Sequence, residues 1–259
     1  MSSPLRSKKR LRDEADPETD VSLERQDWKE TLRSVVPSTS ALVLTDPPYG
    51  TTRNAWDKIP FTFEEYYAEV YGCLRPNGAV VTFSAEPFTS NLVLAPGSHF
   101  KYCWHWNKRL GTNFLNAKKQ PLRTMETLVV GYRKQCLYNP QMTAEQPGKK
   151  ARSWKRRNTA TGSYRPYGEA TYDSSAGKYP TTLLSFYNPP KGKTHPTEKP
   201  VDLCEYLIKT YTDPGDLVVD PFCGTGAVAV ACRNTGRSFC GGDTSEEFLE
   251  VARARLAST

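Results

Sequence analysis

The sequence predicts an α/β fold with a doubly wound, mostly parallel sheet. Short apolar segments with the length and β-branched content of buried strands alternate with segments whose apolar residues recur at helical spacing. A glycine-rich turn, Gly224 to Gly226, also joins one such strand directly to a helix, as in strand–helix–strand units. We therefore expect a Rossmann-like sheet with helices on both faces.

The first half of the chain contains a predicted strand, a helix and further strands. Residues 41–45 form an apolar strand that stops at Asp46. Residues 61–74 carry apolar side chains at helical spacing, and the proline and glycine at 76–78 end that pattern. Further strands are expected over residues 79–83, 100–106 and 127–132.

Regular patterns fade between residues 135 and 190 and return after residue 200. Aromatic residues, proline, glycine and positive charge dominate residues 135–190, which predicts an irregular insertion. The remaining elements are expected as a helix over 201–211, a strand over 217–219, a helix over 226–233, a strand over 238–241 and a helix over 245–256.

The N-terminal 25 residues predict a disordered, charged tail. A cluster of Lys and Arg between Lys8 and Arg12 is followed by an acidic cluster, and such a segment buries too little apolar surface to offset its ordering entropy. Residues 26–259 are then the folded domain. The basic cluster also resembles a nuclear localisation signal or a phosphate-binding arm.

Composition limits the classes of partner and site. The chain has 259 residues and a net charge of +7, which favours polyanionic partners. Seven cysteines occur without a C-x-x-C pair, so we expect free thiols in a reducing compartment and no metal site; Cys103 and His105 are interpreted as structural. No apolar segment of about 18 residues suggests a membrane span. We expect an intracellular protein, in a bacterium or phage-infected cell, or in the nucleus if the tail is a localisation signal.

Two motifs follow predicted strands. Asp220-Pro221-Phe222-Cys223-Gly224-Thr225-Gly226 opens a helix, and Asp243 lies at the end of the next strand, where an acceptor for ribose hydroxyls belongs. Tight strand–helix packing would also explain the glycines. Asp46-Pro47-Pro48-Tyr49 follows another strand and offers a carboxylate, free carbonyls and an aromatic face on a stiff loop; a proline-rich turn with a surface Asp is the alternative. Both motifs should face one crevice.

Together the motifs resemble those of the amino-methyltransferases that act on bases of nucleic acids. Asp46-Pro47-Pro48-Tyr49 resembles the family's catalytic motif, and residues 220–226 resemble its S-adenosylmethionine motif. The segment from His195 to Pro200 is similar to the one that contacts the methionine end of the cofactor, and Asp243 stands where many relatives bind the ribose. The order of motifs is that of the β group, a circularly permuted class I methyltransferase fold. The resemblance spans residues 40–256.

The resemblance implies S-adenosylmethionine as the cofactor and direct methyl transfer to an exocyclic amine. Asp46 and the Pro47 carbonyl would hold the amine, and Tyr49 would stack on a base flipped out of the duplex. Trp56 and Phe83 are wall residues in this interpretation and core residues in the alternative. The predicted catalytic residues are Asp46, Pro47, Pro48 and Tyr49. The predicted cofactor-binding residues are Asp46, Thr197, Lys199, Pro200, Asp220, Phe222, Gly224, Thr225, Gly226 and Asp243.

Two basic segments predict contacts with nucleic acid. Between Pro147 and Lys199 there are 11 positive and three negative residues with interleaved aromatics, where β-group relatives carry their target-recognition region. A solvated loop is the alternative. The candidate contacts there are Lys149, Lys150, Arg152, Lys155, Arg156, Arg157 and Arg165, and those in the second segment, 113–123, are Lys118, Lys119 and Arg123.

The expected substrate is adenine N6 in DNA, because Asp in the first motif position is typical of the family's adenine enzymes. Cytosine-N4 enzymes more often carry Ser there, so N4 of cytosine is an alternative, as are RNA adenine, a glutamine in a protein, an inactive binding module and a dehydrogenase using the same glycine-rich turn. We expect double-stranded DNA as the partner, a stand-alone enzyme without a nuclease domain, and a homodimer.

Overall fold

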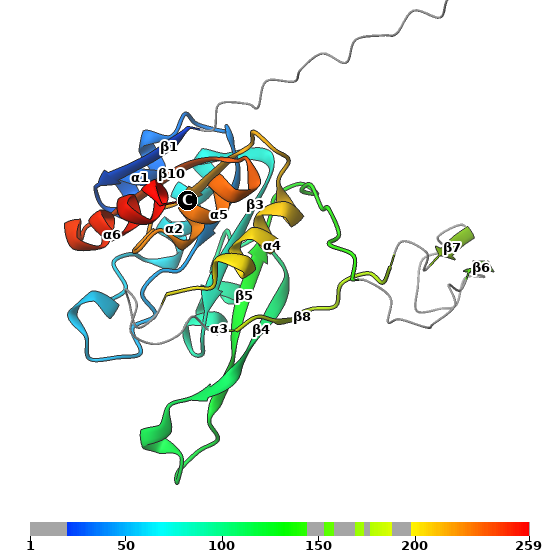
Figure 1. Cartoon of the computed structure of the whole chain (residues 1–259), viewed down its shortest axis with the longest axis horizontal. Coiled ribbons are helices and arrows are strands. Elements are labelled where there is room, and N and C mark those ends of the chain that lie inside the picture. The colour runs from blue at the N-terminus through cyan, green and yellow to red at the C-terminus, as the bar shows by residue number, and fades with distance from the viewer. Residues whose placement is uncertain (1–19, 144–152, 158–168, 174–176, 188–197, 259) are drawn as a thin grey trace, which may run out of the picture.

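The computed structural model describes residues 20–143, 153–157, 169–173, 177–187 and 198–258. An eight-stranded sheet lies between two layers of helices, and a long hairpin projects from one end of the body (Figure 1). The strands of the sheet are β1 (Val21–Arg25), β2 (Ser40–Thr45), β3 (Leu74–Ser84), β4 (Phe100–Thr112), β5 (Arg123–Gly131), β8 (Leu183–Ser185), β9 (Leu217–Asp220) and β10 (Ser238–Asp243).

The sheet is mostly parallel, with the spatial order β1-β10-β9-β2-β3-β5-β4-β8. Strand β5 runs antiparallel to both of its neighbours, and the other pairs are parallel. Two further strands, β6 (Ser153–Arg157) and β7 (Glu169–Asp173), form a separate antiparallel pair. The carboxyl ends of β2, β9 and β10 therefore meet at one edge of the sheet, which is where ligands bind in such folds.

Helices cover both faces of the sheet because its strands are apolar on both sides. On one face lie α1 (Trp28–Ser34), α2 (Phe63–Cys73) and α3 (Phe88–Leu94), and on the other lie α4 (Val201–Tyr211), α5 (Ala227–Thr235) and α6 (Glu246–Ala257). Short 3₁₀ turns occur at η1 (Ala55–Asp57) and η2 (Phe114–Asn116). The predicted doubly wound α/β class is confirmed.

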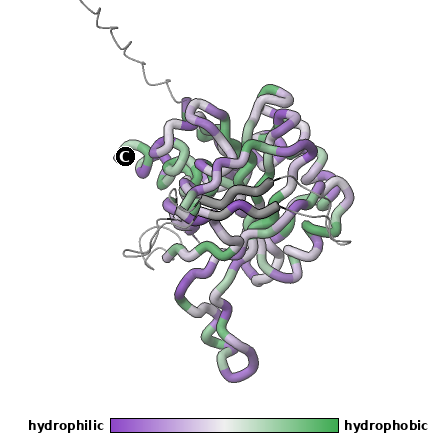
Figure 2. Tube along the Cα trace, turned by 90° about the vertical axis from the view of Figure 1, so that its right-hand side faces the viewer, coloured by the Kyte–Doolittle hydropathy of each residue, from purple (hydrophilic) through white to green (hydrophobic). Residues whose placement is uncertain are grey.

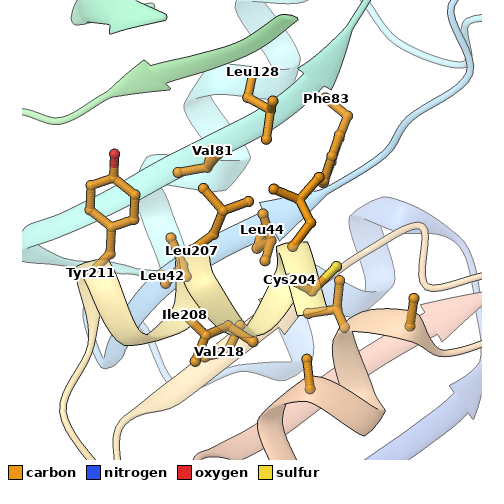
Figure 3. Close-up of a cluster of buried hydrophobic side chains, with 14 of the residues drawn as sticks. Leu42, Leu44, Val81, Phe83, Leu128, Cys204, Leu207, Ile208, Tyr211 and Val218 are labelled. Carbon is orange, nitrogen blue, oxygen red and sulfur yellow. The ribbon is translucent and has the colours of Figure 1, made fainter. Parts of the chain in front are cut away.

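Successive residues of β2 point to opposite faces and so join different cores. Val43 packs among the side chains of α1 and α2, whereas Leu42 and Leu44 pack with α4. Figure 3 shows Leu207 and Ile208 of α4 lying over these strand residues. All five side chains are fully buried, so the two cores hold the strand ends that carry the motifs in fixed positions.

The prediction that residues 1–25 form a disordered tail is wrong for residues 21–25, which form β1 at the edge of the sheet beside β10. Only Val21 and Leu23 are apolar in that strand, and its outer half is exposed, so the hydrophobic signal is weak. Residues 1–19 lie outside the described part of the chain.

The prediction of an irregular insertion over 135–190 is wrong for β8, which pairs with β4, and for the β6–β7 hairpin. These strands have three to five residues each, too short for a clear alternating pattern. Helices α1 and α3 were not predicted, and β4 and β5 extend past their predicted ends into the projecting hairpin. No helix in the described ranges is long and apolar enough to span a bilayer.

Candidate active site

A cleft of about 640 Å³ opens at the carboxyl ends of β2, β9 and β10. It brings together three sequence-predicted segments: the Asp46–Tyr49 loop, the glycine-rich turn after β9, and Lys199 before α4. Asp243 at the end of β10 completes this edge. The predicted catalytic and cofactor motifs thus lie in one crevice, as expected for motifs at the carboxyl ends of parallel strands.

The cleft-lining residues among those predicted are Asp46, Pro47, Pro48, Tyr49, Lys199, Asp220, Phe222, Gly224, Thr225 and Asp243. Gly226 and Pro200 instead stand at the N-caps of α5 and α4. Thr197 lies outside the described residues.

The glycine-rich turn uses its two glycines differently. Gly226 has φ +77°, and a Cβ there would lie 2.8 Å from the Cβ of Ala252, so this glycine lets α5 pack against α6. Gly224 has φ +49°, and a Cβ there would meet no atom within 4 Å. Its N–H donates to Asp243 Oδ2 at 3.0 Å. Packing explains Gly226, whereas Gly224 leaves space at the cleft for a ligand.

Asp220 is a buried carboxyl at the end of β9. Its Oδ1 accepts hydrogen bonds from the Thr45 hydroxyl at 2.7 Å and from the Phe222 N–H at 3.1 Å. Burial raises the pKa of Asp220 to about 7, because these two neutral donors offset only part of the desolvation. Burial therefore makes this carboxyl easier to protonate than an exposed one.

Aromatic side chains form a flat, apolar end of the cleft. Trp28 and Phe222 are nearly parallel, with ring centroids 6.4 Å apart, and Phe248 also lines this end. The side-chain amide nitrogen of Gln26 is buried here, and no hydrogen-bond acceptor for it lies within the described part of the chain. A planar heterocycle with an acceptor atom would fit this end.

Asp46 is the centre of a charged cluster on the other side of the cleft. The Tyr49 hydroxyl donates to Asp46 Oδ1, and the Lys199 ammonium donates to Oδ2, each at 2.5 Å. Lys199 also lies 3.6 Å from Glu126, whose other oxygen accepts from Lys108 at 3.1 Å. Two carboxylates and two ammonium groups thus balance in charge.

Charges within the cluster oppose the desolvation of its members. Burial raises the pKa of Asp46, and the charge of Glu126 adds to this while Lys199 opposes it. Burial would lower the pKa of Lys199, but Asp46 and Glu126 raise it overall. Burial also works against ionisation of Glu126, yet Lys199 and Lys108 hold its pKa below the usual value. Lys199 is the cation shared by both carboxylates.

A second carboxylate shapes the loop that follows Asp46. Asp57 accepts hydrogen bonds from the N–H groups of Tyr49 at 2.8 Å, Gly50 at 3.1 Å and Thr52 at 2.6 Å. Burial alone would raise the pKa of Asp57, but these hydrogen bonds lower it. This loop fixes the backbone of Tyr49 and carries Trp56, which is half-exposed and lines the cleft. Phe83 is buried in the core and also lines the cleft.

The predicted nucleic-acid contacts divide between described and undescribed segments. Lys118, Lys119 and Arg123 are exposed on the projecting hairpin, and Lys155 is exposed on β6. Arg156 and Arg157 belong to the same strand. Lys149, Lys150, Arg152 and Arg165 lie outside the described residues. Within the described ranges no group of His, Cys, Asp and Glu is arranged to hold a metal ion.

Sequence reasoning missed several cleft residues, namely Gln26, Trp28, Trp106, Lys108, Glu126 and Phe248. Glu126 had one usable signal: it is a lone acidic residue directly before an apolar strand segment. The others carry no motif, because their role depends on strand pairing between distant segments.

The fold is that of class I methyltransferases, and comparison with known proteins shows the family. A family model described as DNA methylase matches residues 41–254, and the chain belongs to this family of N6-adenine and N4-cytosine DNA methyltransferases.

Two curated relatives cover most of the chain. It is 26% identical over 245 residues to the type II methyltransferase M.HpaI of Haemophilus parainfluenzae, covering 88% of this chain and 71% of that protein. It is 25% identical over 231 residues to M1.MboII of Moraxella bovis, covering 82% and 86%.

Solved structures share the fold. The M1.HpyAVI–S-adenosylmethionine complex superposes with a TM-score of 0.63 and 23% identity, covering 91% of this chain and 98% of that one. The cytosine-N4-specific PvuII methyltransferase gives a TM-score of 0.61 and 17% identity, covering 92% and 86%. These findings confirm the predicted family and class I fold, and they support S-adenosylmethionine as the cofactor.

Proposed function

We propose that this DNA methyltransferase transfers a methyl group from S-adenosylmethionine to the exocyclic N6 amine of adenine in double-stranded DNA. The observation that carries the proposal is the Asp46 carboxylate at the cleft, fixed on one oxygen by Tyr49 and on the other by Lys199. A carboxylate accepts hydrogen bonds only, so it is suited to an amine donor.

The residues that line the cleft have the chemistry that the cofactor requires. Trp28, Phe222 and Phe248 would hold its adenine ring, and Asp243 would accept from its ribose hydroxyls. Asp220 lies where an ammonium group could pair with it, and the open space beside Gly224 admits the chain between the two ends. When bound, S-adenosylmethionine supplies an electrophilic methyl group.

Asp46 and the Pro47 carbonyl oxygen position the substrate amine. The lone pair of that amine is delocalised into the base, and hydrogen bonds from its two protons would draw the nitrogen toward a tetrahedral geometry. Tyr49 and Lys199 already fix both Asp46 oxygens, so the acceptor is preorganised before substrate arrives. The raised pKa of Asp46 also makes it a better acceptor for the proton that the methylated amine must lose.

The target base has to leave the duplex to reach this carboxylate. Tyr49, Phe83 and Trp106 give the cleft an aromatic wall beside Asp46, and such rings favour an extruded base by stacking. We assign Tyr49 the main stacking role because it is the least buried of the three.

The choice of adenine rests on Asp46 in the first position of the motif. N4 of cytosine is the second candidate, since the PvuII enzyme of the same fold is cytosine-N4-specific. Both amines are hydrogen-bond donors of similar geometry, so a direct experiment has to separate them.

Nucleoside mass spectrometry tests the proposal. Unmethylated plasmid DNA, the same DNA as single strands, and total RNA are each incubated with the protein and labelled S-adenosylmethionine. We expect N6-methyladenine in the duplex. Asp46→Ala should abolish transfer yet bind the cofactor in calorimetry. N4-methylcytosine alone, or label in RNA only, would overturn the assignment.

We also propose that the protein is a homodimer. A molar mass of one chain, measured by light scattering, would refute this proposal.

A further inference from the structure

The projecting hairpin, residues 107–125, has the features of a DNA-inserting element, and we call it the arm. It comprises the end of β4, the turn η2 and the start of β5, and it extends away from the body in both views (Figures 1 and 2). Its base belongs to the cleft, because Lys108 and Thr112 line the cavity beside Trp106 and Glu126. A ligand in this part of the cleft therefore lies next to the arm.

The arm exposes more large apolar side chains than an isolated solvated hairpin explains. Leu115, at its tip, is 100% exposed, and Phe114 beside it is 58% exposed. Leu110, Leu122 and Met125 are each between 37% and 53% exposed along its length. Large exposed apolar side chains gathered on one projecting element favour an interaction site.

The charge of the arm indicates a polyanionic partner. Residues 107–125 contain five positive residues and no acidic one. Lys118 and Lys119 follow the apolar tip directly, and Arg123 lies on the returning strand. Positive charge around an apolar tip matches proteins that neutralise phosphates and insert an apolar side chain between base steps.

The tip is held in one conformation by local hydrogen bonds. Asn113 adopts the left-handed conformation with φ 72°, and its side-chain oxygen accepts from Asn116 Nδ2 at 2.9 Å. Backbone bonds from Ala117 to Phe114 at 3.1 Å and from Lys119 to Asn116 at 2.8 Å continue the turn. Such a tip presents Leu115 without a large further loss of entropy on binding.

The arm begins at the mouth of the cleft. Asn107 pairs with Met125 and Thr112 pairs with Arg123, so residues 113–122 project from a base that itself lines the cleft. Extrusion of a base leaves an unstacked gap in the duplex, and an inserted apolar side chain restores contacts there.

We propose that the arm enters the duplex next to the target base and that Leu115, with Phe114, occupies the gap left by the extruded base. Lys118, Lys119 and Arg123 bind the flanking phosphates. The inference rests on the proposed function, since it assumes a base drawn from duplex DNA into the cleft.

The proposed insertion of Leu115 is tested by measuring the binding affinity and the rate of methyl transfer. Both are measured on one plasmid fragment, as a duplex and as its separated strands. Leu115→Ala should reduce both the binding affinity and the transfer rate about tenfold or more on the duplex. On single strands both should fall less than twofold, because these contain no base stack for Leu115 to enter. Leu115→Met should stay near wild type. Leu94→Ala, an exposed leucine on α3 outside the cleft, is the matched control and should change neither.

The Lys118→Ala/Lys119→Ala double variant separates charge from insertion. It should weaken binding to both forms of DNA and reduce the slope of log K against log salt by about two. Leu115→Ala should leave that slope unchanged.

Three outcomes would overturn the proposed insertion of Leu115. The first two are an equal loss of binding affinity for Leu115→Ala on duplex and single strands, and no loss on either. The third is conversion of a dimer to a monomer by Leu115→Ala, which would make the arm a contact between two copies of the chain. A wild type that binds duplex without methylating it would refute the proposed function, while the Leu115→Ala binding ratio would still test the arm.

Discussion

Replacing Lys199 with methionine should show how far its charge supports Asp46, the proposed catalytic carboxylate. Lys199 is the cation that Asp46 shares with Glu126, and its side chain is only 10% exposed. Methionine keeps most of the volume of lysine and removes the charge. Two carboxylates would then remain with Lys108, which pairs with Glu126 at 3.1 Å.

The structure sets the expected size of the effect. Opposite charges 2.5 Å apart attract by about 7 kcal/mol at an effective dielectric constant of about 20, which is an upper bound. Asp46 is 27% exposed, so water screens part of this attraction. We expect Lys199→Met to lose about 3 kcal/mol of transition-state stabilisation, equivalent to roughly a hundredfold in kcat/KM.

The pH–rate profile is the assay, because it separates this effect from general damage. Burial and Glu126 raise the pKa of Asp46, and Lys199 opposes both. Without Lys199 the carboxylate should ionise at higher pH, so the acid limb of kcat/KM moves upward. Lys199→Arg should restore most activity, and adding Glu126→Gln to Lys199→Met should move the limb back down, because it removes the remaining repulsion. An acid limb that stays in place in Lys199→Met would refute the reasoning.

Three further predictions follow from the same cleft. Because Asp220 has a pKa of about 7 and would pair with a cationic group, calorimetry should show cofactor affinity rising from pH 6 to pH 8, with this trend absent in Asp220→Asn. Gly226→Ala should lose about 2–3 kcal/mol of unfolding free energy through left-handed strain and contact with α6, whereas Gly224→Ala, which meets open space, should lose about 1 kcal/mol in the same denaturant titration. Asp57→Ala leaves three loop N–H groups without their acceptor, so kcat should fall at least tenfold with cofactor affinity unchanged; equal losses in both would contradict a role confined to the loop. The lowered pKa of Asp57 also means that its stabilising effect is present above the unfolded pKa and disappears as the pH falls through the folded value.

The parts of this structure that sequence reasoning found are those with strong local signals. The helix over residues 201–211 has the predicted bounds, because its apolar face repeats over three turns. The strands ending at Asp46 and Asp220 were found because they are short, apolar and followed by proline. Local patterns of this kind fix individual elements, and the parallel order of the strands then fixes the edge at which the motifs meet.

The parts that were missed depend on pairings between distant segments. Two of the five residues of β1 are charged, and β1 forms a strand because it pairs with β10. Glu126 enters the site because β5 pairs with β4, which brings it to Lys108 and within 3.6 Å of Lys199. Neither contact leaves a periodic or spacing signal in the sequence. Lys199 itself was predicted as a cofactor residue, and its contact with the catalytic carboxylate became evident only in three dimensions.

The carboxyls of Asp46 and Asp220 differ in a way that favours a different ligand at each. Asp46 has the Lys199 ammonium on one oxygen, so its charge is already compensated, and a second cation there would face that lysine. A neutral donor such as an amine fits it. Asp220 receives only neutral donors, the Thr45 hydroxyl and the Phe222 N–H, and within the described residues it forms no ion pair. Its pKa of about 7 falls when a cation approaches, so an ammonium group gains most by binding at Asp220. In the proposed function, the charged end of the cofactor therefore binds beside β9 and the uncharged base beside β2, on either side of the methyl group to be transferred.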